Sequence, residues 1–130
     1  MSRRNLQGAT VVLTGASSGI GRGAAYAFAK KGANLVLAAR RQEVLSEVAE
    51  ECKQIGTRAI AVPTDVTDVQ AVRALAQVAA DEFGGRIGVW VNNAGVGVVG
   101  EFGETPIELH DQVVRTNLLG YMHGAHAALP

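Results

Sequence analysis

The stretch TGASSGIG, residues 14–21, decides how this chain folds. It joins an apolar run of strand length, residues 9–13, to a segment of helical periodicity that begins near Gly19. The first turn of a helix leaves backbone N–H groups unpaired, and its aligned peptide dipoles place about half a positive charge there. A phosphate group is therefore stabilised at such a strand-to-helix turn.

The three glycines of this turn have different tasks. Gly15 can adopt the backbone angles of a tight turn, Gly19 lacks a side chain that would hold a pyrophosphate away, and Gly21 lets the helix lie near the strand. Their spacing, Gly-x-x-x-Gly-x-Gly, differs from the Gly-x-Gly-x-x-Gly fingerprint of the standard dinucleotide fold. That literal pattern does occur at residues 95–100, but no helical pattern opens at its last glycine, so we interpret it as a flexible loop.

Length and composition predict one soluble globular domain over residues 1–130. Apolar residues make up 48% of the chain, which is enough for a packed core. Lys plus Arg and Asp plus Glu number 12 each, so no electrostatic footprint points to nucleic acid or to an anionic membrane surface. The basic start lacks the apolar core of a signal peptide, and no apolar run approaches the ~18 residues of a spanning helix.

Cysteine usage points to a reducing compartment. Cys52 is the only cysteine, which excludes an internal disulfide. Its place in a helical apolar stripe predicts a buried thiol rather than a nucleophile. We therefore expect a cytoplasmic location.

Strands and helices alternate along the chain. Strands are predicted at residues 9–13, 34–39, 59–62 and 87–91, and helices follow each of them. The second helix is predicted over residues 42–55, with Gly56 as its C-terminal stop. Thr67 with Gln70 has the form of a capping box, and Thr105 is expected to cap a helix whose first residue is Pro106. That last helix is expected to bend near Asn117. This alternation predicts an α/β fold: a Rossmann-type doubly wound parallel sheet, incomplete, with about four strands and crossover helices.

In such a fold the cofactor lies across the carboxyl ends of the strands. After the second strand, where an NAD-binding protein places Asp or Glu against the ribose 2′-hydroxyl, this chain has Arg40 and Arg41. A guanidinium can pair with a 2′-phosphate in a forked, charge-assisted contact, which favours NADP over NAD. The alternative is that both arginines only begin the next helix on its solvated side.

Four segments together resemble the short-chain dehydrogenase/reductase family of the classical type. They are Thr-Gly-x-x-x-Gly-x-Gly at residues 14–21, Asp65-Val66, Asn92-Asn93-Ala94-Gly95, and Asn117 in the sequence RTNLLG. The resemblance places Asp65 and Val66 beside adenine, and the small Ala94 and Gly95 beside a ribose. The cofactor-binding residues that we predict are Gly15, Ser17, Ser18, Gly19, Ile20, Gly21, Arg40, Arg41, Asp65, Val66, Asn92, Asn93, Ala94 and Gly95.

Two of these assignments have structural alternatives. Asp65 could be a turn residue before a helix cap, and one of the two asparagines could serve only to form a buried turn. Asn117 falls where the family places its active-site asparagine, which is said to bend the helix and hold a water in a proton relay. Judged by its residue type alone, Asn117 would be a solvated helix residue.

The resemblance implies an oxidoreductase that transfers hydride between NADP(H) and a carbonyl or alcohol substrate. In the family, the proton moves through a Tyr that precedes a Lys by four residues, with a Ser nearby, all downstream of the asparagine helix. The chain stops at Pro130, before that region, so we expect the N-terminal cofactor-binding half, inactive by itself. A Tyr-x-x-x-Lys at Tyr26 and Lys30 lies in the wrong helix, and we interpret it as coincidence.

Two other functions stay open: a non-catalytic NADP-binding module or sensor, and an association-prone fragment with an uncovered sheet edge and helix face. The family's late helix implies a homo-oligomer, dimer or tetramer, in the full-length enzyme. His123 and His126 could share a helix face, but no third ligand with metal spacing accompanies them, so no metal site is predicted.

Overall fold

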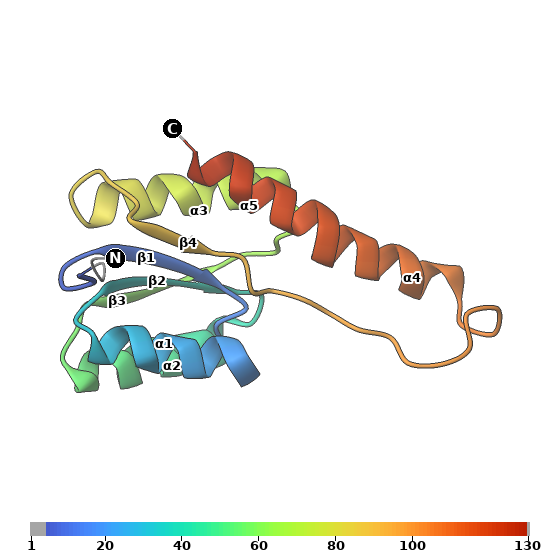
Figure 1. Cartoon of the computed structure of the whole chain (residues 1–130), viewed down its shortest axis with the longest axis horizontal. Coiled ribbons are helices and arrows are strands. Elements are labelled where there is room, and N and C mark those ends of the chain that lie inside the picture. Colours follow the sequence, from blue (N-terminus) through green and yellow to red (C-terminus); the bar gives the residue numbers. More distant parts are fainter. Residues whose placement is uncertain (1–4, 130) are drawn as a thin grey trace.

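The computed structural model describes residues 5–129, which form a parallel sheet with helices on both faces (Figure 1). Its four strands lie in the order β3-β2-β1-β4. They are β1 (Thr10–Thr14), β2 (Asn34–Ala39), β3 (Ala59–Pro63) and β4 (Val89–Val91). The predicted incomplete, doubly wound α/β sheet is thereby confirmed.

The helices form two layers. One layer holds α1 (Gly19–Lys30) and α2 (Gln42–Ile55), and the opposite layer holds α3 (Val69–Glu82) and α5 (Gly120–Ala128). A long rod made of α4 (Ile107–Val114), the π-helical turn η1 (Arg115–Leu119) and α5 begins well outside the sheet and ends over it (Figure 1).

The core lies on both faces of the sheet, because successive side chains of a strand point to opposite sides. On β1, Val11 and Leu13 belong to the cluster under α1 and α2, whereas Val12 packs in the cluster with Leu75 of α3. All four side chains are fully buried. Burial on both faces explains why the strands read as uninterrupted apolar runs.

The predicted boundaries are correct for β2 and α2. β1 begins and ends one residue later than predicted, β3 ends one residue later, and β4 has only three residues. Gly56 ends α2 with a left-handed backbone, φ 120°, as a C-terminal glycine should. No helix opens after the Gly-x-Gly-x-x-Gly pattern at residues 95–100, so its rejection as a fingerprint is confirmed. The irregularity expected near Asn117 is the π-helical turn η1.

Both predicted helix caps are wrong. The carboxylate of Asp68, not Thr67, caps α3 by accepting from the amides of Gln70 and Ala71 at 3.0 and 3.2 Å. Thr67 instead donates its hydroxyl to Asp65 at 2.7 Å. At α4 the cap position is occupied by Pro106, and the hydroxyl of the preceding Thr105 donates to the carbonyl of Glu101, 2.8 Å away.

The segment that leaves β4 is held by the buried hydroxyl of Thr14. This oxygen accepts from the amides of Asn93 and Ala94, at 3.0 and 3.1 Å, and donates to the carbonyl of Val91 at 3.3 Å. One side chain at the end of β1 therefore continues the β1–β4 pairing beyond the three residues of β4.

Helix α5 lies close to the sheet because two of its residues have no side chain. A Cβ at Gly120 would lie 2.7 Å from the Val66 side chain. A Cβ at Gly124 would overlap the side-chain oxygen of Asn92 and lie 2.7 Å from the indole nitrogen of Trp90. The closeness of α5 therefore depends on glycine at both positions.

We predict opposite effects for two glycine-to-alanine substitutions in helices. Gly124→Ala should lower the free energy of unfolding by about 1–3 kcal/mol, because the new methyl group overpacks the contact with Asn92. Gly23→Ala in α1, where a Cβ meets nothing within 4 Å, should raise it by about 0.5–1 kcal/mol. Urea denaturation measures both, and a destabilised Gly23→Ala or an unchanged Gly124→Ala would contradict the packing described.

We predict that Thr14→Val lowers the free energy of unfolding by about 2 kcal/mol, because the amides of Asn93 and Ala94 lose their acceptor. Thr14→Ser keeps the hydroxyl and should cost about 1 kcal/mol, the value of one buried methyl group. Equal losses for Val and Ser in the same urea experiment would mean that packing, not the hydroxyl, is what matters at this position.

Candidate functional site

A cleft of about 670 Å³ lies where the carboxyl ends of the strands meet the segment after β4. Twelve of the residues predicted from the sequence line it, although they come from four separate parts of the chain. They are Gly15, Ser17, Ser18, Ile20, Gly21, Arg40, Arg41, Asp65, Val66, Asn93, Ala94 and Gly95. Gly19, Asn92 and Asn117 are outside this lining.

The turn between β1 and α1 has the geometry of an anion site. Gly15 and Gly19 have φ of 66° and 54°, a left-handed conformation that favours glycine. A Cβ at Gly21 would overlap the carbonyl oxygen of Gly15, so α1 approaches the strand closely only with glycine here. Ser18 is the N-cap residue of α1, and among residues 5–129 its side chain accepts no hydrogen bond from a helix amide. The amides of the first turn are therefore available to a ligand.

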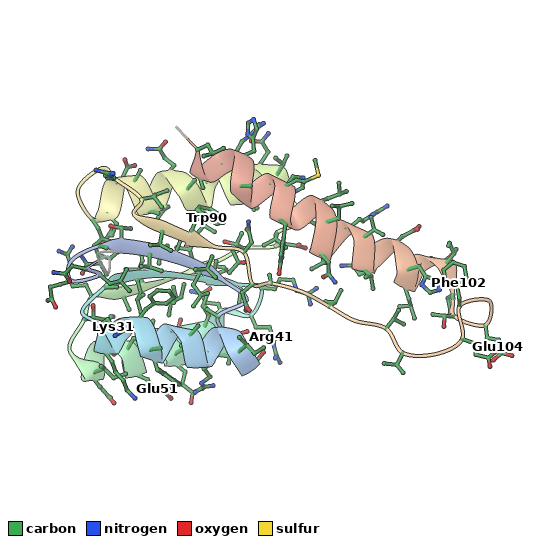
Figure 2. The ribbon with its side chains drawn as sticks, viewed as in Figure 1. Lys31, Arg41, Glu51, Trp90, Phe102 and Glu104 are labelled. Atoms are coloured by element: carbon green, nitrogen blue, oxygen red, sulfur yellow. The ribbon has the colours of Figure 1, made fainter. Side chains whose placement is uncertain are left out.

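Two arginines follow β2 at the rim of the cleft. Arg40 and Arg41 are both exposed, and Arg41 occupies the cap position of α2 without a side-chain cap bond in the described residues. Figure 2 shows Arg41 at the end of the sheet where α1 begins, whereas Lys31 lies at the opposite end. Both guanidinium groups therefore belong to the same end of the sheet as the glycine turn.

The carboxylate of Asp65 is preorganised beside these arginines. One oxygen, Oδ1, accepts from the amide and the hydroxyl of Thr67 at 2.9 and 2.7 Å. Burial raises the pKa of Asp65, but the two bonds from Thr67 and the charge of Arg40 outweigh it and hold this pKa below its ordinary value. Asp65 is therefore ionised at neutral pH, and it lines the cleft.

The two adjacent asparagines after β4 have different partners. Asn93 donates from its side chain to the carbonyl of Gly15 at 3.2 Å and lines the cleft. Asn92 instead accepts from the Trp90 indole at 2.9 Å and donates to the carbonyl of Tyr121 at 3.2 Å. The side chain of Asn92 thus ties β4 to α5.

Asn117, in the π-helical turn η1, forms two hydrogen bonds to the wall of the cleft. Its Oδ1 accepts from the amide of Val96 at 2.9 Å, and its Nδ2 donates to the carbonyl of the same residue at 2.7 Å. Both polar ends of the side chain are therefore used to hold the irregular segment that follows Gly95. Val96 and Thr116 line the cleft beside it.

Sequence reasoning missed five lining residues, Ala38, Ala39, Thr64, Val96 and Thr116. Thr64 directly follows β3, so the rule that ligands meet the carboxyl ends of strands could have found it. Thr116 is buried in η1 and accepts from the side chain of Gln112 at 3.1 Å, which nothing in the local sequence indicates.

The Tyr26-x-x-x-Lys30 pattern is not part of the cleft, as predicted. The hydroxyl of Tyr26 hydrogen-bonds to Glu51 of α2 and accepts from Arg22 at 2.7 Å, so it lies between the two helices. Burial and the bond to Glu51 raise the pKa of Tyr26, the opposite of what a proton-donating tyrosine requires. Figure 2 shows Glu51 on the outer side of that helix layer.

Cys52 and His110 are not part of the cleft. The thiol of Cys52 is fully buried, and burial together with Glu51 raises its pKa to about 11, so the predicted inert thiol is confirmed. His110 rests on the ring of Phe102 with 4.4 Å between centroids. Residues 5–129 contain no group of three metal-ligating side chains. In the same residues, no helix is long and apolar enough to cross a membrane.

Known proteins are similar to this chain in sequence and in fold. The short chain dehydrogenase family model matches residues 9–130. The chain is 40% identical over 126 residues to the uncharacterized oxidoreductase YxnA of Bacillus subtilis, covering 97% of this chain and 35% of that protein. It is 38% identical to the 11-beta-hydroxysteroid dehydrogenase-like 4A of Arabidopsis thaliana, over 96% of this chain and 42% of that one.

A solved structure is similar to this chain in fold. A short chain dehydrogenase/reductase from Burkholderia phymatum in complex with NAD superposes with a TM-score of 0.92 at 34% identity, over 96% of this chain and 44% of that one. The chain thus spans less than half the length of each of these three proteins. Because the family model covers all but the first eight residues, and the glycine turn lies where the fold requires it, the chain belongs to the short-chain dehydrogenase family.

Proposed function

We propose that this chain is the NADP-binding part of an oxidoreductase that transfers hydride between NADP(H) and a carbonyl or alcohol substrate. The observation that carries the proposal is the meeting, in one cleft, of open helix-terminal amides at residues 17–21 with Arg40 and Arg41. The bound nicotinamide would supply the hydride acceptor or donor.

The residues present fit the parts of a dinucleotide in order. The first-turn amides of α1 would hold the diphosphate, and Ala94 and Gly95 leave room for a ribose against the backbone. Asp65, ionised and held by Thr67, would accept from the exocyclic amino group of adenine. Asn117 would support the reaction centre by holding Val96, and its part in a proton relay stays a prediction.

The sign of the charge after β2 supports NADP rather than NAD. No carboxylate follows Ala39 directly; the next residues are Arg40, Arg41 and Gln42. Asp65 contributes one negative charge beside two guanidiniums, so the rim keeps a positive excess for a 2′-phosphate. The NAD in the Burkholderia phymatum structure belongs to that protein.

The names of the relatives support an enzyme more than a sensor. The two curated relatives described above are named as an oxidoreductase and as a hydroxysteroid dehydrogenase-like protein. A proton-donating Tyr-x-x-x-Lys does not face the cleft within residues 5–129, so we propose that these residues bind cofactor and do not catalyse turnover alone.

Assembly and location stay predictions. Large apolar side chains on α4, η1 and α5 are exposed, which supports the expected homo-oligomer of the full-length protein. They include Ile107, Leu109, Val114, Leu118 and Met122. The single buried thiol supports a reducing, cytoplasmic compartment.

Cofactor preference is tested by calorimetry of the chain with NADP and with NAD. We expect NADP to bind at least about tenfold more tightly, since a charge-assisted contact contributes about 1.5–3 kcal/mol. Arg40→Asp should remove or reverse this ratio, because a carboxylate repels the 2′-phosphate and accepts from a 2′-hydroxyl.

The matched control is Arg73→Asp, which makes the same charge change at an exposed position of α3, in the layer on the other face of the sheet. It should leave the NADP-to-NAD ratio unchanged. Equal affinities of the parent chain for the two cofactors would refute the NADP preference.

A further inference from the structure

Helix α5 reaches the adenine end of the cleft through a residue that no motif includes. The Nδ1 atom of His123 lies 2.8 Å from the carbonyl oxygen of Val66, in the turn between β3 and α3. Directly beside it, Gly120 makes room for the Val66 side chain, which is 8% exposed and lines the cleft. Val66 is thus held by α5 through both its backbone and its side chain.

The direction of this hydrogen bond follows from its chemistry. A carbonyl oxygen carries no proton, so Nδ1 of His123 must donate. His123 is therefore protonated at Nδ1, as the neutral tautomer or as imidazolium, and the bond exists in both forms.

The hydrogen bond of His123 is connected to Asp65 through one peptide unit. The carbonyl of Val66 and the amide of Thr67 belong to the same planar peptide, so fixing the carbonyl fixes the direction of the N–H on its other side. That N–H donates to Oδ1 of Asp65 at 2.9 Å. The chain of contacts runs from the His123 imidazole through the 66–67 peptide to the Asp65 carboxylate, and each bond polarises the next.

We propose that His123 is a positioning residue for the adenine end of the cofactor, acting through the Val66–Thr67 peptide on Asp65. The ligand's identity in this inference rests on the proposed function. His123 itself is outside the lining of the cleft, so its effect on a ligand is indirect. The hydrogen bonds between Asn117 and Val96, on the opposite wall of the cleft, do not involve this peptide.

Two substitutions of nearly equal shape separate the hydrogen bond from packing. In His123→Asn the side-chain amide places a donor where Nδ1 was, whereas His123→Leu has the same branching and no donor. The matched control is His126→Leu, because His126 lies exposed one turn later in α5. All variants are made in the full 130-residue chain, and thermal unfolding confirms that each is folded.

The ligands are adenosine 2′,5′-bisphosphate, which carries only the adenine end, and nicotinamide mononucleotide, which carries only the other. For His123→Leu we expect the affinity for adenosine 2′,5′-bisphosphate to fall about three- to tenfold, the value of one hydrogen bond. His123→Asn should restore it to within about twofold, and nicotinamide mononucleotide should bind all variants alike.

Amide hydrogen exchange gives a readout that needs no ligand. Exchange at Thr67 should accelerate in His123→Leu and stay near the parent rate in His123→Asn and His126→Leu. Unchanged exchange and unchanged adenosine 2′,5′-bisphosphate affinity in His123→Leu would overturn the inference, and so would equal losses for both ligands. If the parent chain binds neither ligand, the proposed function fails, and the exchange rates alone decide whether His123 holds this turn.

Discussion

The contact between Gly21 and the carbonyl of Gly15 is the constraint on which the rest of the site depends. A side chain at Gly21 would overlap that oxygen, so only glycine lets α1 begin directly over the end of β1. The same carbonyl accepts from the side chain of Asn93, 3.2 Å away, which joins the segment after β4 to the turn. One peptide group thus fixes the position of the helix terminus and of the opposite wall of the cleft.

Electrostatics in this protein are local. The chain carries equal numbers of acidic and basic residues, so no long-range field draws an anion to it. The positive end of α1 and the two arginines after β2 nevertheless lie around one cleft. Asp65 is the acidic group of this cleft, and its pKa is lowered by the two hydrogen bonds from Thr67 and by the charge of Arg40. A ligand with phosphates and a hydrogen-bond donor suits this arrangement better than a purely anionic one.

The fold could be predicted from local sequence signals, because the apolar runs and stripes correspond to strands and helix faces that are buried in the structure. The apolar run of β2 and the stripe of α2 ending at Gly56 gave correct boundaries, since both elements are covered by neighbours and end at an unambiguous signal. The cap of α3 was not predictable in the same way. Thr67 and Asp68 are both good N-cap residues, and in the structure the hydroxyl of Thr67 donates to Asp65, whereas the carboxylate of Asp68 accepts from the helix amides.

Tertiary contacts decided what the sequence could not. Asn92 and Asn93 are identical in type and adjacent, yet one turns to α5 and the other to Gly15, because successive residues leaving a strand face opposite ways. From the sequence, His123 was considered only as a residue that could share a helix face with His126, whereas its observed partner, Val66, lies 57 residues away. The preference for NADP is still a prediction, as is every ligand contact assigned to the cleft.

The most direct test of the account is a titration of the ¹⁵N-labelled chain with NADP, followed by NMR. We predict the largest amide shifts at residues 17–21, in the first turn of α1, with smaller ones at residues 93–96 and around Asp65. Saturable shifts confined to other parts of the molecule, or no shifts at millimolar NADP in a folded sample, would contradict the claim that this turn holds the diphosphate of a dinucleotide.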